Sequence, residues 1–286
     1  MNTTCIIILN YNHGPKTATC IASVLDQTLQ DFRLLIVDNE STDDSLEVIT
    51  TFLEKKNLSH RIIGAREENP APASPGEVLL VKSGRNGGYS YGNNCGIRLA
   101  QSMGIFSRLL ILNNDLVLKE DFLREMAGRY EELREQHQTE KIALGATEMG
   151  EDGEIRHNGF HYIHLPSGIT FASPVFPSFR YIVGSCIFAG IGAPLMDESF
   201  FLYFDDTQYS KILQKEGFIL ESSPRSAFIH EVGGSGIPDL QWMIFKSLRR
   251  FYFLNYPLLL PVVVPIRLML IAYLGIKRRM KRYISY

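Results

Sequence analysis

Short apolar runs alternate with amphipathic segments through the first half of the chain. Runs typical of buried strands lie at residues 5–9, 34–37 and 109–112. Apolar side chains recur at helical spacing in the segments between and after these runs, at residues 17–25, 45–54, 93–103 and 122–133. This alternation of strand and helix is typical of βαβ units. It predicts an α/β fold with a doubly wound, mostly parallel sheet.

The pattern changes after residue 142. Pro166, Pro174 and Pro177 interrupt short aromatic runs, which predicts an irregular or hairpin region, and residues 183–192 return to the pattern of a core element. Residues 251–276 are nearly all apolar but contain three prolines and Arg267. An arginine near the middle of a membrane span costs about 2.5–3.5 kcal/mol, and the prolines interrupt helical hydrogen bonds. We therefore expect a helical tail that lies in the plane of a membrane, with a true span and docking onto another subunit as alternatives.

The charge distribution changes the picture of this tail. Nine of the 29 Lys and Arg residues lie between Lys246 and Tyr286, where there is no Asp or Glu, and the rest of the chain is strongly acidic. An acidic body with a cationic tail predicts a catalytic unit held on an anionic membrane surface. The four cysteines are isolated and the first residues do not resemble a secretory leader. We expect reduced thiols and a cytoplasmic location, peripheral on the inner face of the cell membrane.

Polar side chains stand where several apolar runs end. Asp38 and Asp115 each follow a predicted strand, and His230 follows residues 227–229. Asp205 and Asp206 stand side by side after five apolar residues. Burying such a pair is costly unless it binds a cation or takes part in chemistry. Strand ends are also where α/β proteins bind ligands, so these residues predict a functional site.

Each of these signals also has a structural interpretation. Asp38 suits a nucleotide base or ribose, or equally a helix cap, and residues 41–44 fit a capping box for the following helix. The glycine-rich segment 86–96 suits phosphate binding or a tight turn, and it matches neither GxGxxG nor the P-loop. Residues 113–115 form either a divalent-cation site or an Asn-Asn-Asp turn. A lone histidine such as His230 is more often structural than metal-binding.

In their order along the chain, these motifs resemble those of family 2 glycosyltransferases, and more closely the bacterial rhamnosyl- and galactofuranosyltransferase-like branch. The opening Leu9-Asn10-Tyr11-Asn12 also fits that branch, and the resemblance covers roughly residues 3–256. The resemblance implies the GT-A fold with a C-terminal membrane-associating helical tail. Its parts would be a nucleotide-sugar-binding half at 1–115, an acceptor-binding and catalytic half at 116–245, and the basic apolar tail at 246–286.

The resemblance also implies a role for each motif. Asp206 would be the catalytic base with Asp205 as its neighbour, and Asp115 and His230 would bind Mg²⁺ or Mn²⁺. Asp115 takes the place of the last acid of the family's DxD motif, whereas Asn113 stands where the first acid often lies. Contacts with the nucleotide sugar are expected from a further set of residues, namely Asn10, Tyr11, Asp38, Asn39, Asn86, Gly88, Asn94 and Asn114.

The implied reaction is inverting transfer of a hexose from a nucleotide-diphosphate sugar. Rhamnose on dTDP is the first expectation, and galactofuranose or another hexose on UDP is the second. A lipid-linked glycan in the synthesis of a surface polysaccharide, such as O-antigen or capsule, is the expected acceptor, and no nucleic acid is expected as a partner. Gln208 stands where an acid is usual, and Ile212 where an arginine is usual. A non-catalytic nucleotide-sugar-binding scaffold is therefore the alternative, and a nucleotidyltransferase, which would release pyrophosphate, is a third hypothesis.

Overall fold

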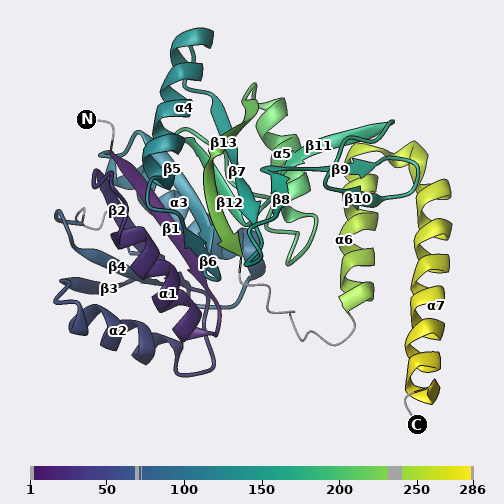
Figure 1. The fold of residues 1–286 in the computed structure, drawn as a ribbon, viewed down its shortest axis with the longest axis horizontal. Coiled ribbons are helices and arrows are strands. Elements are labelled where there is room, and N and C mark those ends of the chain that lie inside the picture. Colours follow the sequence, from purple (N-terminus) through teal and green to yellow (C-terminus); the bar gives the residue numbers. More distant parts are fainter. Residues whose placement is uncertain (1–2, 68–70, 72, 231–239, 285–286) are drawn as a thin grey trace.

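The structure is a computed structural model that describes residues 3–67, 71, 73–230 and 240–284. Its centre is a ten-stranded sheet with the order β3-β4-β2-β1-β5-β12-β7-β13-β6, to which β8 adds by pairing with β7 (Figure 1). The strands of this sheet are β1 (Thr4–Asn10), β2 (Phe32–Asp38), β3 (His60–Gly64), β4 (Val78–Lys82), β5 (Arg108–Asn113), β6 (Leu116–Leu118), β7 (Ile142–Met149), β8 (Ile155–Asn158), β12 (Cys186–Gly190) and β13 (Ile219–His230). The helices are α1 (Gly14–Leu25), α2 (Ser45–Lys55), α3 (Gly88–Met103), α4 (Phe122–His137), α5 (Asp205–Lys215), α6 (Leu240–Asn255) and α7 (Leu260–Ile284), with a 3₁₀ turn η1 (Pro257–Leu259).

The N-terminal half confirms the predicted alternation of strands and helices. β1 pairs in parallel with β2 on one side and with β5 on the other. Successive side chains of β1 point to opposite faces of the sheet: Ile6 and Ile8 pack in a core with residues of α1, α2 and α4. Cys5 and Ile7 pack in a second core with residues of α3 and α5. A strand that is apolar on both faces is buried between two helical layers, as its continuous apolar run predicts.

The centre of the sheet departs from a purely parallel arrangement. β12 lies between β5 and β7 and runs antiparallel to both, so the core element expected at residues 183–192 is an inserted antiparallel strand. β7 and β13 are parallel, and β13 carries an irregularity between Ser223 and Ala227. β12 brings residues 184–185 to the carboxyl end of β5, because Asn113 N donates to Ser185 O over 3.0 Å. The inserted strand β12 therefore places residues of the C-terminal half of the chain beside the carboxyl end of β5, which belongs to the N-terminal half.

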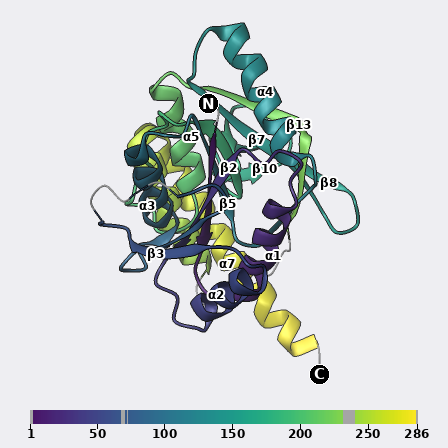
Figure 2. The same ribbon diagram turned by 90° about the vertical axis from the view of Figure 1, so that its left-hand side faces the viewer.

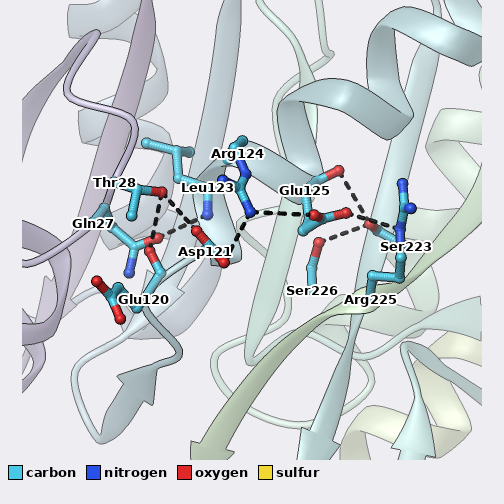
Figure 3. A network of polar contacts seen from close by, with 10 residues as sticks. All are labelled: Gln27, Thr28, Glu120, Asp121, Leu123, Arg124, Glu125, Ser223, Arg225 and Ser226. Atoms are coloured by element: carbon cyan, nitrogen blue, oxygen red, sulfur yellow. Dashed lines mark hydrogen bonds and ion pairs between the residues drawn. The ribbon is translucent and has the colours of Figure 1, made fainter.

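Polar contacts link the start of α4 with the segment after α1 and with β13 (Figure 3). Gln27 Oε1 accepts from the backbone N–H of Leu123 over 2.8 Å, and Thr28 Oγ1 donates to Asp121 over 2.9 Å. On the other side, Arg225 in the irregular part of β13 pairs with Glu125 at 2.8 Å. These contacts therefore hold α4 in position beside α1 and against the sheet.

The predicted hairpin region forms a second, three-stranded sheet with the order β10-β9-β11. Its strands are β9 (Phe160–His164), β10 (Ile169–Phe171) and β11 (Ser178–Ile182). The small sheet lies against α6 and α7, which run side by side at one end of the molecule (Figure 1). Phe251 and Tyr252 of α6 and Val263 of α7 are fully buried in a core with residues of this sheet. Figure 2 shows the end of α7 projecting beyond the rest of the chain.

The C-terminal apolar stretch is divided where its prolines predict. α6 ends at Asn255, Pro257 opens the 3₁₀ turn, and α7 begins at Leu260 with Pro265 inside it. Among the residues that the structure describes, no helix is long and apolar enough to span a bilayer. The boundary between a catalytic half and a tail at residue 246 stays a prediction, and the buried side chains of α6 attach this segment to the small sheet.

One local prediction is wrong. The capping box expected at Ser41 and Asp44 does not form, because Asp44 caps α2 without a side-chain hydrogen bond. The Asp43 carboxylate accepts from the backbone N–H of Ser45 over 3.0 Å instead. The Ser41 hydroxyl is used elsewhere: it donates to Asp38 over 2.5 Å. The polar segment after β2 therefore forms hydrogen bonds both with the end of β2 and with the start of α2.

Candidate active site

Asn10 is the centre of a buried hydrogen-bond network at the carboxyl ends of β1, β2 and β5. Its amide nitrogen donates to Asp38 over 2.8 Å and to Ser41 over 2.9 Å. Its amide oxygen accepts from Thr17 over 2.6 Å and from Asn114 over 3.2 Å. Three of the predicted contact residues, Asn10, Asp38 and Asn114, are thus brought together. The network holds Asp38 in a fixed orientation at the strand end, where a ligand of an α/β sheet binds.

The other predicted contact residues lie beside this network or further away. Asn39 donates to Asn86 Oδ1 and to the carbonyl of Gly88, both over 3.1 Å, which links the end of β2 to the start of α3. Tyr11 is exposed on the loop after β1. Asn94 is fully buried. Its side-chain amide forms hydrogen bonds with Met196 and Glu198, so it holds the segment that contains these two residues in place. The predicted nucleotide-sugar contacts of these residues stay predictions.

Asp115 and His230 meet at the edge of the sheet. His230 ends β13, and its Nε2 lies 3.2 Å from Asp115 Oδ1, while its Nδ1 lies 3.4 Å from Glu148 Oε2. Glu148 also pairs with His157 at 3.0 Å. Burial alone would lower the pKa of His230, but hydrogen bonds and attraction from Asp115 and Glu148 outweigh it and raise the pKa to about 9. This corner of the site is a negative environment that favours a cation.

The donor set at this corner fits a hard divalent ion only in part. Carboxylate oxygen and imidazole nitrogen are suitable ligands for Mn²⁺. Asp115 Oδ1 is buried and accepts no well-aligned hydrogen bond, although His230 Nε2 lies nearby. Within the described part of the chain, however, no group of three or more His, Cys, Asp or Glu side chains is arranged to hold a metal. Asp115 and His230 could therefore supply two ligands, and oxygens of a diphosphate and water would supply the rest.

Asp205 and Asp206 open helix α5 in unequal environments. Asp206 accepts from the backbone N–H of Gly184 over 3.1 Å and of Thr207 over 2.6 Å. Burial raises the pKa of both carboxyls, and the charge of Asp206 helps to raise that of Asp205 to about 8. The hydrogen bonds to Asp206 favour its ionised form. The pair therefore provides one carboxylate held ready to accept a proton, beside a second acid that resists ionisation.

The backbone before the two acids adopts an unusual conformation. Tyr203 and Phe204 have φ values of 66° and 61°, in the left-handed region that non-glycine residues rarely adopt. Residue 88 fixes the same loop: Tyr89 N donates to Phe201 O over 2.8 Å, and a Cβ atom on Gly88 would collide with that carbonyl. Such conformations persist only where surrounding structure enforces them, often at functional sites. Gly88 thus has a structural role in positioning the acid pair.

One cavity of about 450 Å³ connects the acids to the predicted metal corner. Asp205, Asp206 and His230 line it, together with Tyr89, whose hydroxyl donates to Gly184 O. Arg267 of α7 and Ile244 of α6 line the same cavity. The arrangement brings together a proton acceptor, a candidate cation site and side chains from the C-terminal helices.

Sequence analysis missed several residues of this site. Glu148 stands at the end of the apolar run of β7, the same signal that identified Asp115, and it could have been found in that way. Gly184 and Tyr89 join the site through backbone atoms and a hydroxyl whose partner is 95 residues away. No local sequence pattern predicts a contact between residues so far apart in the chain. Arg267 was interpreted only as an obstacle to a membrane span.

Several known proteins that are similar to this chain are glycosyltransferases. Residues 5–142 match the profile of Glycosyl transferase family 2. The chain is 27% identical to the low-salt glycan biosynthesis hexosyltransferase Agl10 of Haloferax volcanii, over 69% of this chain and 66% of the relative. The chain covers less than two thirds of the length of the first curated relatives it matches, 35% of one and 66% of the other.

Two solved structures share the fold. Mannosyltransferase PcManGT from Pyrobaculum calidifontis, in complex with GDP-Man and Mn²⁺, aligns with a TM-score of 0.54 at 12% identity, over 99% of this chain and 80% of that one. S. aureus TarS 1–349, in complex with UDP-GlcNAc, aligns with a TM-score of 0.58 at 13% identity, over 88% of this chain and 67% of that one. The chain therefore shares the fold of these two transferases, as expected for a GT-A fold, and residues 5–142 are similar to family 2 glycosyltransferases.

Proposed function

We propose that this chain transfers a hexose from a nucleotide-diphosphate sugar to a hydroxyl of an acceptor, with inversion at the anomeric carbon. The observation that carries the proposal is the shared cavity, which Asp206 and His230 both line. The similar proteins include one bound to GDP-Man and Mn²⁺ and one bound to UDP-GlcNAc, which supports a nucleotide-sugar donor. The network around Asn10 and Asp38 supports binding of the nucleoside at the ends of β1 and β2.

In this mechanism Asp206 takes the proton of the acceptor hydroxyl as the oxygen attacks the anomeric carbon. The new C–O bond forms as the bond to the diphosphate breaks, so the nucleoside diphosphate leaves on the opposite face and inversion results. Burial raises the pKa of Asp206, which makes it a better proton acceptor, while the neighbouring Asp205 stays protonated because its own pKa is raised to about 8. Asp115 and His230 would hold Mg²⁺ or Mn²⁺, which when bound neutralises charge on the leaving diphosphate.

Donor and acceptor are proposed at a finer level from the resemblance and the charge pattern. The donor would be dTDP-rhamnose, or a UDP-linked hexose such as galactofuranose. The acceptor would be a lipid-linked glycan of a surface polysaccharide, and the basic residues after Lys246 would hold the chain on the inner face of the membrane. Vesicle flotation tests the membrane proposal: binding to anionic vesicles should weaken with added salt, and equal binding to neutral vesicles would contradict it.

The transferase proposal is tested by Asp206→Asn. Because the base acts on the acceptor and not on the nucleotide, this variant should lose transfer at least about 100-fold while its affinity for the donor stays the same. Release of nucleoside diphosphate measures transfer, and calorimetry measures donor binding. A variant that keeps most of its kcat would refute the assignment of the base. Donor binding without any turnover by the wild-type protein would favour the scaffold alternative, and release of pyrophosphate would favour a nucleotidyltransferase.

A further inference from the structure

Arg267 is a cation of α7 that reaches the cavity containing the acid pair. Its side chain is half-buried, and its Nε atom is fully buried without a hydrogen-bond partner. In the described ranges no Asp or Glu forms an ion pair with it. Burying a guanidinium without a partner is costly, and burial lowers the pKa of Arg267. Arg267 therefore brings a buried N–H donor without a partner to the residues that line this cavity.

α7 lies away from the proposed nucleoside site, although the cavity that Arg267 lines also includes His230 of the proposed metal corner. Figure 1 shows α7 on the far side of α5 from β1 and β2, where Asn10 and Asp38 lie. The neighbours of Arg267 in the cavity wall include Gly168 and Thr170 of the small sheet and Ile244 of α6. None of these belongs to the sheet edge that carries the nucleotide network. Arg267 therefore joins the cavity wall from the C-terminal helices, in the same cavity as Asp206.

A second cavity, formed by the same two helices, has a lining that suits one class of anion. It has a volume of about 710 Å³ between α6 and α7, and Phe253, Leu260 and Val264 contribute to its apolar wall. Its cationic lining residues are Lys246, Arg249 and Arg250. A groove that combines apolar walls with several cations is complementary to a lipid that carries phosphate, and less so to an acidic sugar.

We propose that Arg267 binds the phosphate group of a lipid-linked acceptor and so positions the acceptor hydroxyl for Asp206. This inference rests on the proposed transferase function and names a recognition residue for its acceptor. A guanidinium forms paired hydrogen bonds with phosphate oxygens, so a lysine in its place would keep the charge and lose the paired geometry. The arginine that makes α7 a poor membrane span would thus serve as the acceptor-binding residue.

Calorimetry on the full chain tests this inference with Arg267→Gln, Arg267→Lys and the matched control Arg66→Gln, which removes an exposed arginine after β3. The probes are farnesyl diphosphate, farnesol and methyl glucuronide, and a panel of UDP, dTDP and GDP with Mn²⁺ reports on the donor site. Arg267→Gln should weaken farnesyl diphosphate binding about tenfold or more, as expected for a lost charge-assisted pair. Arg267→Lys should lie in between, and farnesol and nucleotide binding should not change.

Several results would overturn the inference. These are equal affinity of Arg267→Gln and wild-type protein for farnesyl diphosphate, an equal loss in Arg66→Gln, or no binding of farnesyl diphosphate by the wild-type protein. Weaker nucleotide binding in Arg267→Gln would assign the residue to the donor, and selective loss of methyl glucuronide would assign it to an acidic sugar. A failure of the proposed function is distinct, because the wild-type protein would then release no nucleoside diphosphate in the transfer assay, whether or not it binds farnesyl diphosphate. If Arg267→Gln does not fold, the lysine variant carries the comparison.

Discussion

Replacing Asp205 by Asn should make the stability of the protein less dependent on pH. Asp205 is 7% exposed, and burial together with the charge of Asp206 raises its pKa from 3.8 to about 8. A carboxyl that is harder to ionise in the folded state binds more protons there than in the unfolded chain between these two values. Stability from the neutral Asp205 is therefore fully present below pH 3.8 and is lost as the pH rises through about 8.

The size of the effect follows from the same shift. Each pH unit between the unfolded and folded pKa values corresponds to about 1.4 kcal/mol, which gives an upper bound of ~6 kcal/mol for full ionisation of Asp205. The true effect is smaller, because the two adjacent acids titrate as a pair and one proton serves both. We expect the free energy of unfolding of Asp205→Asn, relative to wild type, to increase by ~2 kcal/mol between pH 5 and pH 9.

Urea denaturation at pH 5, 7 and 9 measures this difference, with Asp26→Asn as the control because Asp26 is an exposed carboxylate. Taking the difference between variant and wild type removes the contributions of other titrating groups, such as Glu148 and His230. The control should run parallel to wild type at all three pH values. Parallel profiles for Asp205→Asn as well would refute the argument that Asp205 is protonated in the folded protein.

Two further predictions test the metal corner and the loop that holds the acids. His230→Ala should reduce the Mn²⁺-dependent gain in nucleoside diphosphate affinity about 10–100-fold by calorimetry, since it removes one of two candidate ligands; an unchanged Mn²⁺ effect would make His230 a structural residue. Gly88→Ala should destabilise the protein by ~1–3 kcal/mol in urea denaturation and should lower transfer. The new Cβ would collide with the Phe201 carbonyl, and the φ of 83° at this position disfavours alanine. The control Gly128→Ala, in an open position, should do neither.

Much of the fold could be predicted because its signals are local. The apolar runs of β1, β2 and β5 identify strands that are buried on both faces, and the first polar residue after each run marks a strand end. The start of α3 was placed at residue 93, whereas the helix begins at Gly88. Gly88 and the polar residues that follow it have weak helical propensity. Hydrogen bonds from the Tyr89 hydroxyl to the Gly184 carbonyl and from the Tyr91 hydroxyl to the Ser83 carbonyl support this first turn instead.

The site could be predicted only as far as single residues reveal chemistry. Asp115, His230 and the acid pair stand at the ends of apolar runs, and the structure brings Asp206 and His230 to one cavity. The unequal environments of Asp205 and Asp206 were not predictable, because they depend on the backbone N–H of Gly184. The position of Arg267 in the cavity wall was not predictable either, since the sequence does not indicate that α7 folds back against the small sheet.

Gln208 bears on the choice between an enzyme and a scaffold. It stands where an acid is usual in the family that the sequence resembles, and this departure motivated the scaffold hypothesis together with that at Ile212. In the structure Gln208 is buried, and its Oε1 accepts from Asn255 Nδ2 over 2.7 Å, which ties α5 to the end of α6. An ionised acid at this buried position would add a second negative charge within one helical turn of Asp206. The departure thus has a structural explanation that leaves Asp206 and the acceptor side of the cavity intact, and it gives the scaffold hypothesis less support than the sequence alone suggests.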